Sequence, residues 1–226
     1  MALDTVIMLK GAQIFQRDHL ILADVNLHLE KGEFVYLIGK TGSGKSSLLQ
    51  TLYAELPLKE GEGMIAGVDL RKLKKKDIPF LRRKIGIVFQ DFQLLYDRNV
   101  EQNLQFVLKA TGWKNKVEIQ TRIDDVLQKT GLQTKKHKMP HQLSGGEQQR
   151  LGIARALIND PDLILADEPS GNLDPETTAE ILQLLLEICK AGRTVLVATH
   201  DYSLFELHHA RTLKCDQGKI LDSNLL

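Results

Sequence analysis

The segment Gly39–Ser46 constrains this chain more than any other part of its sequence. It reads GKTGSGKS and fits G-x-x-x-x-G-K-[S/T], the pattern of a phosphate-binding loop between a β-strand and an α-helix. An apolar run at 34–38 precedes it, and apolar residues at helical spacing follow it at 48–53. The alternative is an ordinary glycine turn with a solvated lysine. The flanking strand and helix patterns favour phosphate binding.

Each part of this loop has a physical reason to hold a phosphate. Glycines let the backbone curl so that successive N–H groups point at an anion, and the helix N-terminus adds its positive end. We expect Lys45 to reach the β- and γ-phosphates and the Ser46 hydroxyl to ligate Mg²⁺. The residues expected to contact ATP are Gly39, Lys40, Thr41, Gly42, Ser43, Gly44, Lys45, Ser46 and Ser47.

Four fully apolar runs predict an α/β fold with a mostly parallel sheet. They cover 34–38, 85–89, 163–166 and 194–199 and are separated by helical segments, as expected for strands buried on both faces. Ligands of such sheets bind at the carboxyl ends of the strands. The polar residues expected at that edge, besides the glycine loop, are Gln90, Asp167, Glu168 and His200.

The remaining segments add two layers to this core. Alternating residues in 1–30, with turn signals at Gly11, 17–18 and 31–32, predict an N-terminal antiparallel β layer. The pattern from 91 to 160 is helical and predicts an inserted α-helical subdomain. We therefore expect 1–90 and 161–226 to form the nucleotide-binding core. Within it, a helix from Pro175 to about 190 and two short strands in 211–221 complete the chain.

Composition excludes some classes of function. The net charge of +1 over 226 residues gives no global field that would recruit nucleic acid. The N-terminus lacks a secretory pattern, and no apolar run approaches the roughly 18 residues that span a bilayer, so any membrane role needs another chain. Two lone cysteines without C-x-x-C fit a reducing cytosol. The basic runs at 71–76 and 82–84 form either a solvated face or a surface near anionic lipid headgroups.

The acid pair after the third apolar run suits phosphoryl transfer. Asp167 is expected to hold Mg²⁺ and Glu168 to polarise the attacking water, because this chemistry needs positioning and charge neutralisation. A capping or solvated acid pair is the alternative, which Pro169 disfavours. His200 is expected to hold the γ-phosphate edge and position Glu168, and Gln90 to reach Mg²⁺ and the water.

The stretch 143–150, LSGGEQQR, is the second specific motif. Ser144 and Glu147 form a capping box before a helical run, which requires no ligand. Gly145 and Gly146 are not explained by capping, since each glycine in a first helical turn costs up to about 1 kcal/mol relative to alanine. A phosphate that approaches this helix N-terminus closely would explain them.

Together these motifs, in this order, resemble the ATP-binding cassette (ABC) ATPase family along essentially the whole chain. The resemblance implies an ATP-hydrolysing enzyme that forms a head-to-tail homodimer, with each ATP between one chain's phosphate loop and the other chain's signature motif. Residues acting in trans would be Ser144, Gly145, Gly146, Glu147 and Asp174. Asp174-Pro175 also fits a plain N-cap. Phe15 falls where the family has an adenine-stacking aromatic, and a core aromatic is the alternative.

The segment 85–103, with its Asp97-Arg98 pair, most resembles the cell-division branch of that family. Members of this branch act with an integral membrane partner at the cytoplasmic face of the membrane and control cell-wall hydrolases. The residues expected to contact such a partner are Asp91, Phe92, Leu94, Leu95, Asp97 and Arg98. Lipoprotein-release and macrolide-efflux ATPases share most of these motifs and remain alternatives.

Two other classes of function fit the sequence less well. A nucleotide-gated binding module without useful hydrolysis is disfavoured by the intact Glu168 and His200. A soluble nucleic-acid ATPase is disfavoured because sustained heptads are absent between the two motifs.

Overall fold

Six strands form the larger sheet, in the order β10-β9-β3-β8-β7-β6. The computed structural model describes residues 4–223, apart from the side chains of Ser203 and Glu206. In this sheet β9, β3, β8, β7 and β6 are parallel and β10 is antiparallel. The strands are β3 (Phe34–Ile38), β6 (Ile85–Val88), β7 (Leu163–Asp167), β8 (Thr194–Thr199), β9 (Arg211–Asp216) and β10 (Lys219–Asp222). The four apolar runs are thus confirmed as parallel strands.

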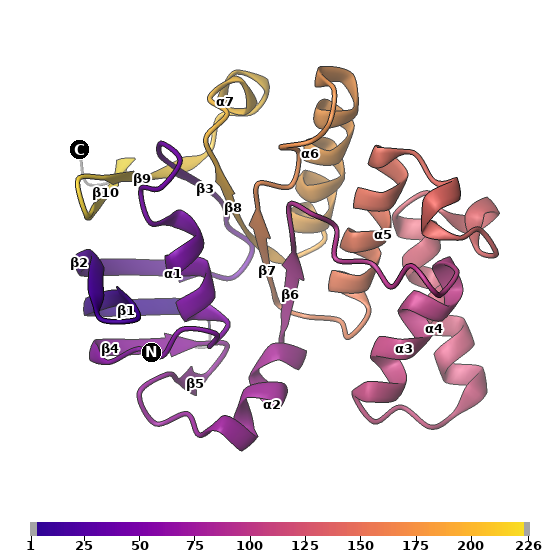
Figure 1. Cartoon of the computed structure of the whole chain (residues 1–226), viewed down its shortest axis with the longest axis horizontal. Helices are drawn as coiled ribbons and strands as arrows, with labels where there is room; N and C mark the ends of the chain where they lie inside the picture. The colour runs from indigo at the N-terminus through magenta and orange to yellow at the C-terminus, as the bar shows by residue number, and fades with distance from the viewer. Residues whose placement is uncertain (1–3, 224–226) are drawn as a thin grey trace.

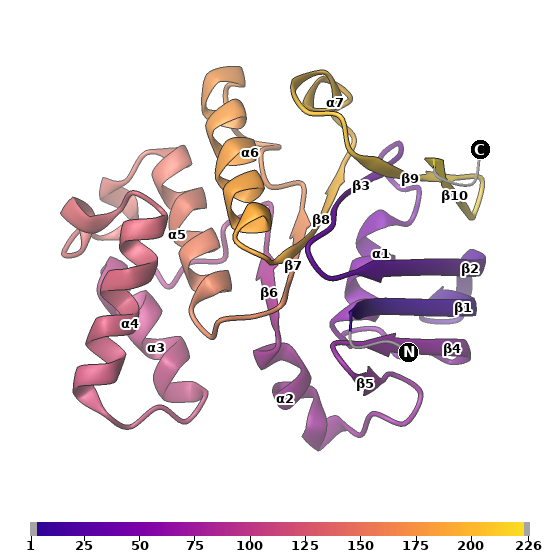
Figure 2. The same ribbon diagram turned by 180° about the vertical axis from the view of Figure 1, so that it is seen from behind.

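Helices cover both faces of this sheet. Figures 1 and 2 show α1 on one side and α6 on the other. Alternate residues of the central strands accordingly enter two different cores, as in β3, where Val35 and Leu37 join α1 and Tyr36 joins the helices behind. The helices are α1 (Lys45–Leu52), α2 (Ile78–Arg83), α3 (Val100–Ala110), α4 (Lys116–Lys129), α5 (Gly145–Leu157), α6 (Pro175–Lys190) and α7 (Ser203–Leu207).

The N-terminal layer is one long hairpin with two further strands. Its order is β2-β1-β4-β5, all antiparallel. The expected turn at Gly11 is wrong, because Gly11 lies inside β1, where the register shifts between Leu9 and Ala12. Its φ of 55° forms a bulge that bends the strand without ending it. The strands are β1 (Thr5–Gln16), β2 (His19–Glu30), β4 (Glu60–Ile65) and β5 (Val68–Asp69).

The helical segment 91–160 contributes α3, α4 and α5, which lie to one side of the sheet (Figure 1). Their apolar faces share one core with α6 and one face of the large sheet. No helix among residues 4–223 is long and apolar enough to cross a membrane.

Candidate active site

The phosphate loop joins β3 to α1, and two of its glycines are required by close packing. A Cβ on Gly39 would lie 2.6 Å from the Cys215 carbonyl oxygen. Gly44, the N-cap of α1, has a φ of 104°, and a Cβ there would lie 2.9 Å from the Ile21 side chain. Only glycine therefore allows the loop to lie this close to β2 and β9.

Lys45 is buried in the loop and already has partners. Its side chain is 5% exposed, its ammonium donates to the Gly39 carbonyl at 2.8 Å, and it lies 3.4 Å from Glu168 Oε1. A buried ammonium is stable only when its charge is compensated. The loop and Glu168, the residue after β7, provide that compensation.

Ser46 and Asp167 come together from α1 and β7. The Ser46 hydroxyl donates to Asp167 Oδ1 at 3.2 Å. Burial raises the pKa of the Asp167 carboxyl above its ordinary value, while the hydrogen bond from Ser46 acts in the opposite direction. A hydroxyl and a carboxylate are oxygen donors of the type that Mg²⁺ prefers, so this pair fits the expected metal site.

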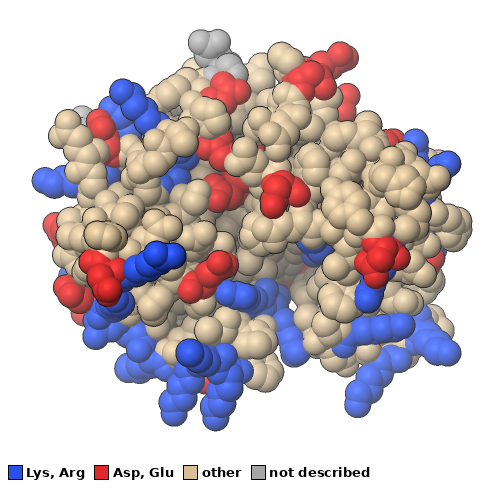
Figure 3. All heavy atoms as spheres, viewed as in Figure 1, with Lys and Arg blue, Asp and Glu red and all other residues tan. Residues whose placement is uncertain are grey.

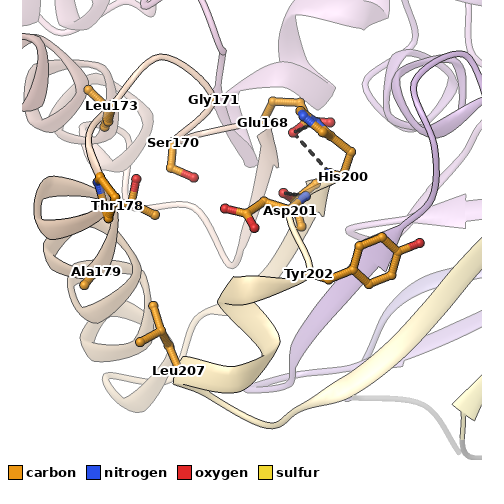
Figure 4. A pocket seen from close by; sticks show the side chains of 12 residues that line it. Glu168, Ser170, Gly171, Leu173, Thr178, Ala179, His200, Asp201, Tyr202 and Leu207 are labelled. Carbon is orange, nitrogen blue, oxygen red and sulfur yellow. Dashed lines mark hydrogen bonds and ion pairs between the residues drawn. The ribbon is translucent and has the colours of Figure 1, made fainter.

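Glu168 and His200 lie side by side where β7 and β8 end (Figure 4). His200 Nδ1 is 2.8 Å from Glu168 Oε2, and the backbone N–H of His200 donates to the same oxygen at 3.3 Å. Glu168 has a φ of 47°, and its own N–H donates to the Ala198 carbonyl at 2.9 Å. One carboxylate oxygen of Glu168 is therefore held by Lys45 and the other by His200. Glu168 and His200 also line a pocket of about 610 Å³.

Gln90 follows β6 and borders a second cavity, which Asp167 also lines. Asn172 donates to the Gln90 carbonyl at 3.3 Å. The Gln90 amide nitrogen lies 3.1 Å from the position that a Gly171 Cβ would take. Gln90 is thus close to the metal pair but packed against the loop after Glu168.

Phe15 lies on β1, half-buried and outside both hydrophobic cores. The Lys59 ammonium lies 5.4 Å from the centre of its ring. The structure therefore disfavours the core interpretation of Phe15.

The signature motif 143–150 begins α5, with the expected capping box. The Glu147 N–H donates to Ser144 Oγ at 3.2 Å, and the Ser144 N–H donates to Glu147 Oε2 at 2.9 Å. A hydrogen bond from Lys135 lowers the pKa of Glu147. Helix α5 lies across β6 and β7 from α1 in both views (Figures 1 and 2). One chain therefore does not bring its signature motif to its own phosphate loop.

The structure explains the glycine at position 146 by packing within the chain, which the sequence did not reveal. A Cβ there would lie 2.5 Å from Thr177 Cγ2 on α6, so contact between α5 and α6 excludes a side chain. The argument that both glycines imply a phosphate holds, at most, for Gly145, whose Cβ would lie 3.3 Å from Leu173. Asp174 caps α6 by accepting from the Thr177 N–H at 3.0 Å and its hydroxyl at 2.6 Å.

Two residues that sequence reasoning missed bind the loop after Gln90. The Arg155 guanidinium on α5 donates to the Phe92 carbonyl at 2.8 Å and to the Gln93 carbonyl. Phe92 and Gln93 both have left-handed backbones, with φ of 59° and 47°. Burial lowers the pKa of Arg155. An arginine at a half-buried helix position, with backbone partners far away in sequence, carries no sequence signal.

Asn103 on α3 is the second residue that holds the loop after Gln90, and its side chain is almost fully buried. Its Oδ1 accepts from the Leu95 N–H at 2.9 Å, and its amide donates to the carbonyls of Leu95, Arg98 and Asn99, each at 3.0 Å. An asparagine on the apolar face of a predicted helix is the signal that could have revealed it.

The loop 91–98 contains both buried and exposed residues. Leu94 is buried in the core with α3 and α5, so it is unavailable to a partner, contrary to the expectation from sequence. Asp91 and Asp97 are exposed, and the Arg98 guanidinium lies 4.4 Å from the centre of the Phe106 ring.

Comparison with known proteins places these features in a family. The family model for the ABC transporter matches residues 22–171. The chain is 41% identical over 200 residues to the cell division ATP-binding protein FtsE of Streptococcus pneumoniae, covering 88% of this chain and 86% of that protein. Identity to FtsE of Escherichia coli is 43% over 199 residues, covering 88% and 89%.

Solved structures of ABC cassettes are similar to this chain over nearly its whole length. Dimeric MJ0796, a bacterial ABC transporter cassette, superposes with a TM-score of 0.83 at 35% identity, covering 95% of this chain and 96% of that one. CbiO1 of Clostridium perfringens, part of the CbiONQ ABC transporter complex, gives a TM-score of 0.87 at 32% identity, covering 96% and 87%. A post-hydrolysis state of the MJ0796 cassette with ADP and Pi also matches, at 33% identity and a TM-score of 0.81 over 95% of this chain and 96% of that one. The chain therefore belongs to the ABC transporter family, as an ATP-binding and ATP-hydrolysing cassette of the FtsE type.

Proposed function

We propose that this chain is the Mg²⁺-dependent ATPase subunit of a cell-division complex, acting from the cytoplasmic face with an integral membrane partner of the FtsX type. The observation that carries the proposal is the convergence of Lys45, Asp167, Glu168 and His200 at the ends of three neighbouring strands, together with the FtsE relatives.

In this proposal the chain's own groups orient ATP and the attacking water. Lys45 exchanges the Gly39 carbonyl for phosphate oxygens. Glu168, oriented by His200, polarises the water in line with the leaving group. Ser46 and Asp167 would hold Mg²⁺, with Gln90 near them, and the ion would neutralise charge on the phosphates. Phe15, on β1, would supply the aromatic ring that stacks on the adenine.

The site is completed by a second copy of the chain. Ser144, Gly145, Gly146 and Glu147 lie too far around the fold to serve their own phosphate loop, so we assign them, with Asp174, to the partner's ATP. The α5 N-terminus would direct its first N–H groups at an anion. ATP then closes the dimer and hydrolysis opens it.

The loop 91–98 is the proposed contact with the membrane partner, through Asp91, Asp97 and Arg98. Arg155 and Asn103 fix this loop to α5 and α3, so motion of these helices relative to the sheet would move the contact surface.

ATP binding and turnover test the first part of the proposal. Lys45→Ala should lower ATP affinity at least tenfold, measured by calorimetry, while Lys10→Ala, an exposed lysine on β1, should leave it unchanged. Equal affinity in both variants would reject the phosphate loop as the ATP site.

Charge removal in the loop tests the second part. Asp97→Ala with Arg98→Ala should abolish stimulation of turnover by the membrane partner and leave ATP binding intact. Loss of ATP binding would reject the loop as the partner contact. Co-purification with a transporter subunit in place of an FtsX-like protein would select lipoprotein release or efflux as the function.

A further inference from the structure

The segment 71–84, which we call the basic rim, is strongly positive, whereas the rest of the chain has a net negative charge. It contains eight lysines and arginines and one acid, Asp77, a formal charge of +7. Because the whole chain carries +1, the other residues together carry −6. The charge of this protein is therefore strongly polarised toward one short segment.

The positive charges of the basic rim are hardly neutralised. Among residues 4–223, the only carboxylate paired with the rim is Asp69, which lies 3.0 Å from Lys72. Lys74, Lys75 and Lys76 are exposed and have no ion pair in that range.

Two of the three arginines and the last lysine are held by backbone carbonyls. Arg71 donates to the Gly61 carbonyl at 3.1 Å, Arg82 to the Tyr53 carbonyl at 3.0 Å and Lys84 to the Ala66 carbonyl at 3.3 Å. These neutral acceptors orient the side chains and leave their charge uncancelled.

The basic run 135–138 differs from the rim in its ion pairs. In the segment 135–138, Lys135 lies 2.9 Å from Glu147 and Lys136 lies 2.8 Å from Asp124. Local carboxylates thus pair with two of the three lysines in that run. Among residues 4–223, only one of the eight basic side chains in the rim has such a partner, so a solvated face explains the rim less well than an external anionic surface does.

An aromatic side chain lies within the rim. Phe80 on α2 is 60% exposed, and the Arg83 guanidinium lies 5.2 Å from the centre of its ring. The combination suits the headgroup region of an anionic bilayer, where cations contact phosphates and aromatic rings enter the acyl boundary.

The rim also lies next to the proposed contact with the membrane partner. Arg82 lines the same cavity as Gln90 and Asp91. Figure 3 shows lysine and arginine side chains gathered along the lower edge of the molecule, over β5 and α2. A partner docked at 91–98 would therefore hold the rim close to the membrane surface.

We propose that the basic rim binds anionic phospholipid headgroups. The placement near the bilayer rests on the proposed function, but vesicle binding does not require ATP or the partner, so the two can fail separately. Attraction of this kind acts within a Debye length of about 8–10 Å, so the rim would orient a cassette that its partner already holds at the membrane.

Vesicle sedimentation of the full chain tests this proposal. Binding to phosphatidylglycerol vesicles should exceed binding to phosphatidylcholine vesicles and fall with added salt. The triple variant Lys74→Gln, Lys75→Gln, Lys76→Gln should lower the partition coefficient by about 100-fold, at about one order of magnitude per one to two lysines. The matched triple variant Lys190→Gln, Lys214→Gln, Lys219→Gln removes the same charge elsewhere and should have little effect.

Phe80→Ser separates the aromatic contribution from charge. It should weaken vesicle binding and leave basal ATP turnover unchanged, since Phe80 lies outside the active site. Equal loss in both triple variants, equal binding to neutral vesicles, or tighter binding to single- or double-stranded nucleic acid than to anionic vesicles at the same salt would overturn the proposal.

Discussion

Asn103 allows a sharp test of how the loop 91–98 is held. Asn103→Leu keeps the size of the side chain and removes four hydrogen bonds. The carbonyls of Leu95 and Asn99 retain a second hydrogen bond each, from the N–H groups of Arg98 and Asn103. The Leu95 N–H and the Arg98 carbonyl have no second partner among the described residues.

The expected cost follows from those two orphaned groups. A buried polar group that loses its partner costs about 1–3 kcal/mol, and the lower part of that range applies because Leu95 and Arg98 are half-buried. We therefore expect a loss of about 2–3 kcal/mol in the free energy of unfolding. For a chain of this length that lowers Tm by about 4–12 °C.

Urea unfolding followed by the fluorescence of Trp113, the single tryptophan, measures this loss. Trp113 packs against the same core as α3. Gln105→Leu on the same helix is the control and should change stability by less than about 0.5 kcal/mol. Asn103→Asp keeps the acceptor for the Leu95 N–H but turns a carboxylate toward three carbonyls, so it should be at least as unstable as Asn103→Leu. A stable Asn103→Asp variant would refute this account.

Three further predictions concern the active site. Glu168→Gln should lower kcat by about 10²–10⁴ with ATP affinity within tenfold, and should accumulate a dimer in ATP by light scattering; kcat near that of wild type would exclude Glu168 as the residue that activates water. Asp167→Asn should raise the Tm of the nucleotide-free protein at neutral pH while abolishing turnover. Because the pKa of Asp167 is raised in the folded state, the wild-type protein loses stability as pH rises above the ordinary aspartate range. The gain in Tm of Asp167→Asn should therefore shrink as pH is lowered toward that range. A gain that does not depend on pH would contradict burial of the carboxylate as its cause. Gly146→Ala should destabilise the protein through Thr177, and Thr177→Ser, which removes Cγ2 and keeps the hydroxyl, should restore stability in the double variant; denaturation midpoints of all four proteins decide this.

The strands were predictable because each is an apolar run long enough to be buried on both faces. Their ends also located Asp167, Glu168 and His200 at one edge, since parallel strands share a carboxyl edge. The bulge at Gly11 was not predictable, because a glycine with positive φ serves a turn as well as a bulge. The sequence also gave no sign of the contacts of Gly146, which depend on how α5 and α6 pack.

The central position of β3 has a consequence for how the chain is made. Both neighbours of β3 in the sheet, β8 and β9, come from the C-terminal part of the chain, and Phe34 pairs with Val195 about 160 residues later. At roughly 5–20 residues per second of synthesis, β3 leaves the ribosome about 8–30 s before either neighbour exists. During that time the hairpin β1–β2 and α1 are the earlier elements that can cover one of its apolar faces, through Val35 and Leu37. During that time β3, the strand that later carries the phosphate loop, is open to chaperones and to aggregation along both of its edges.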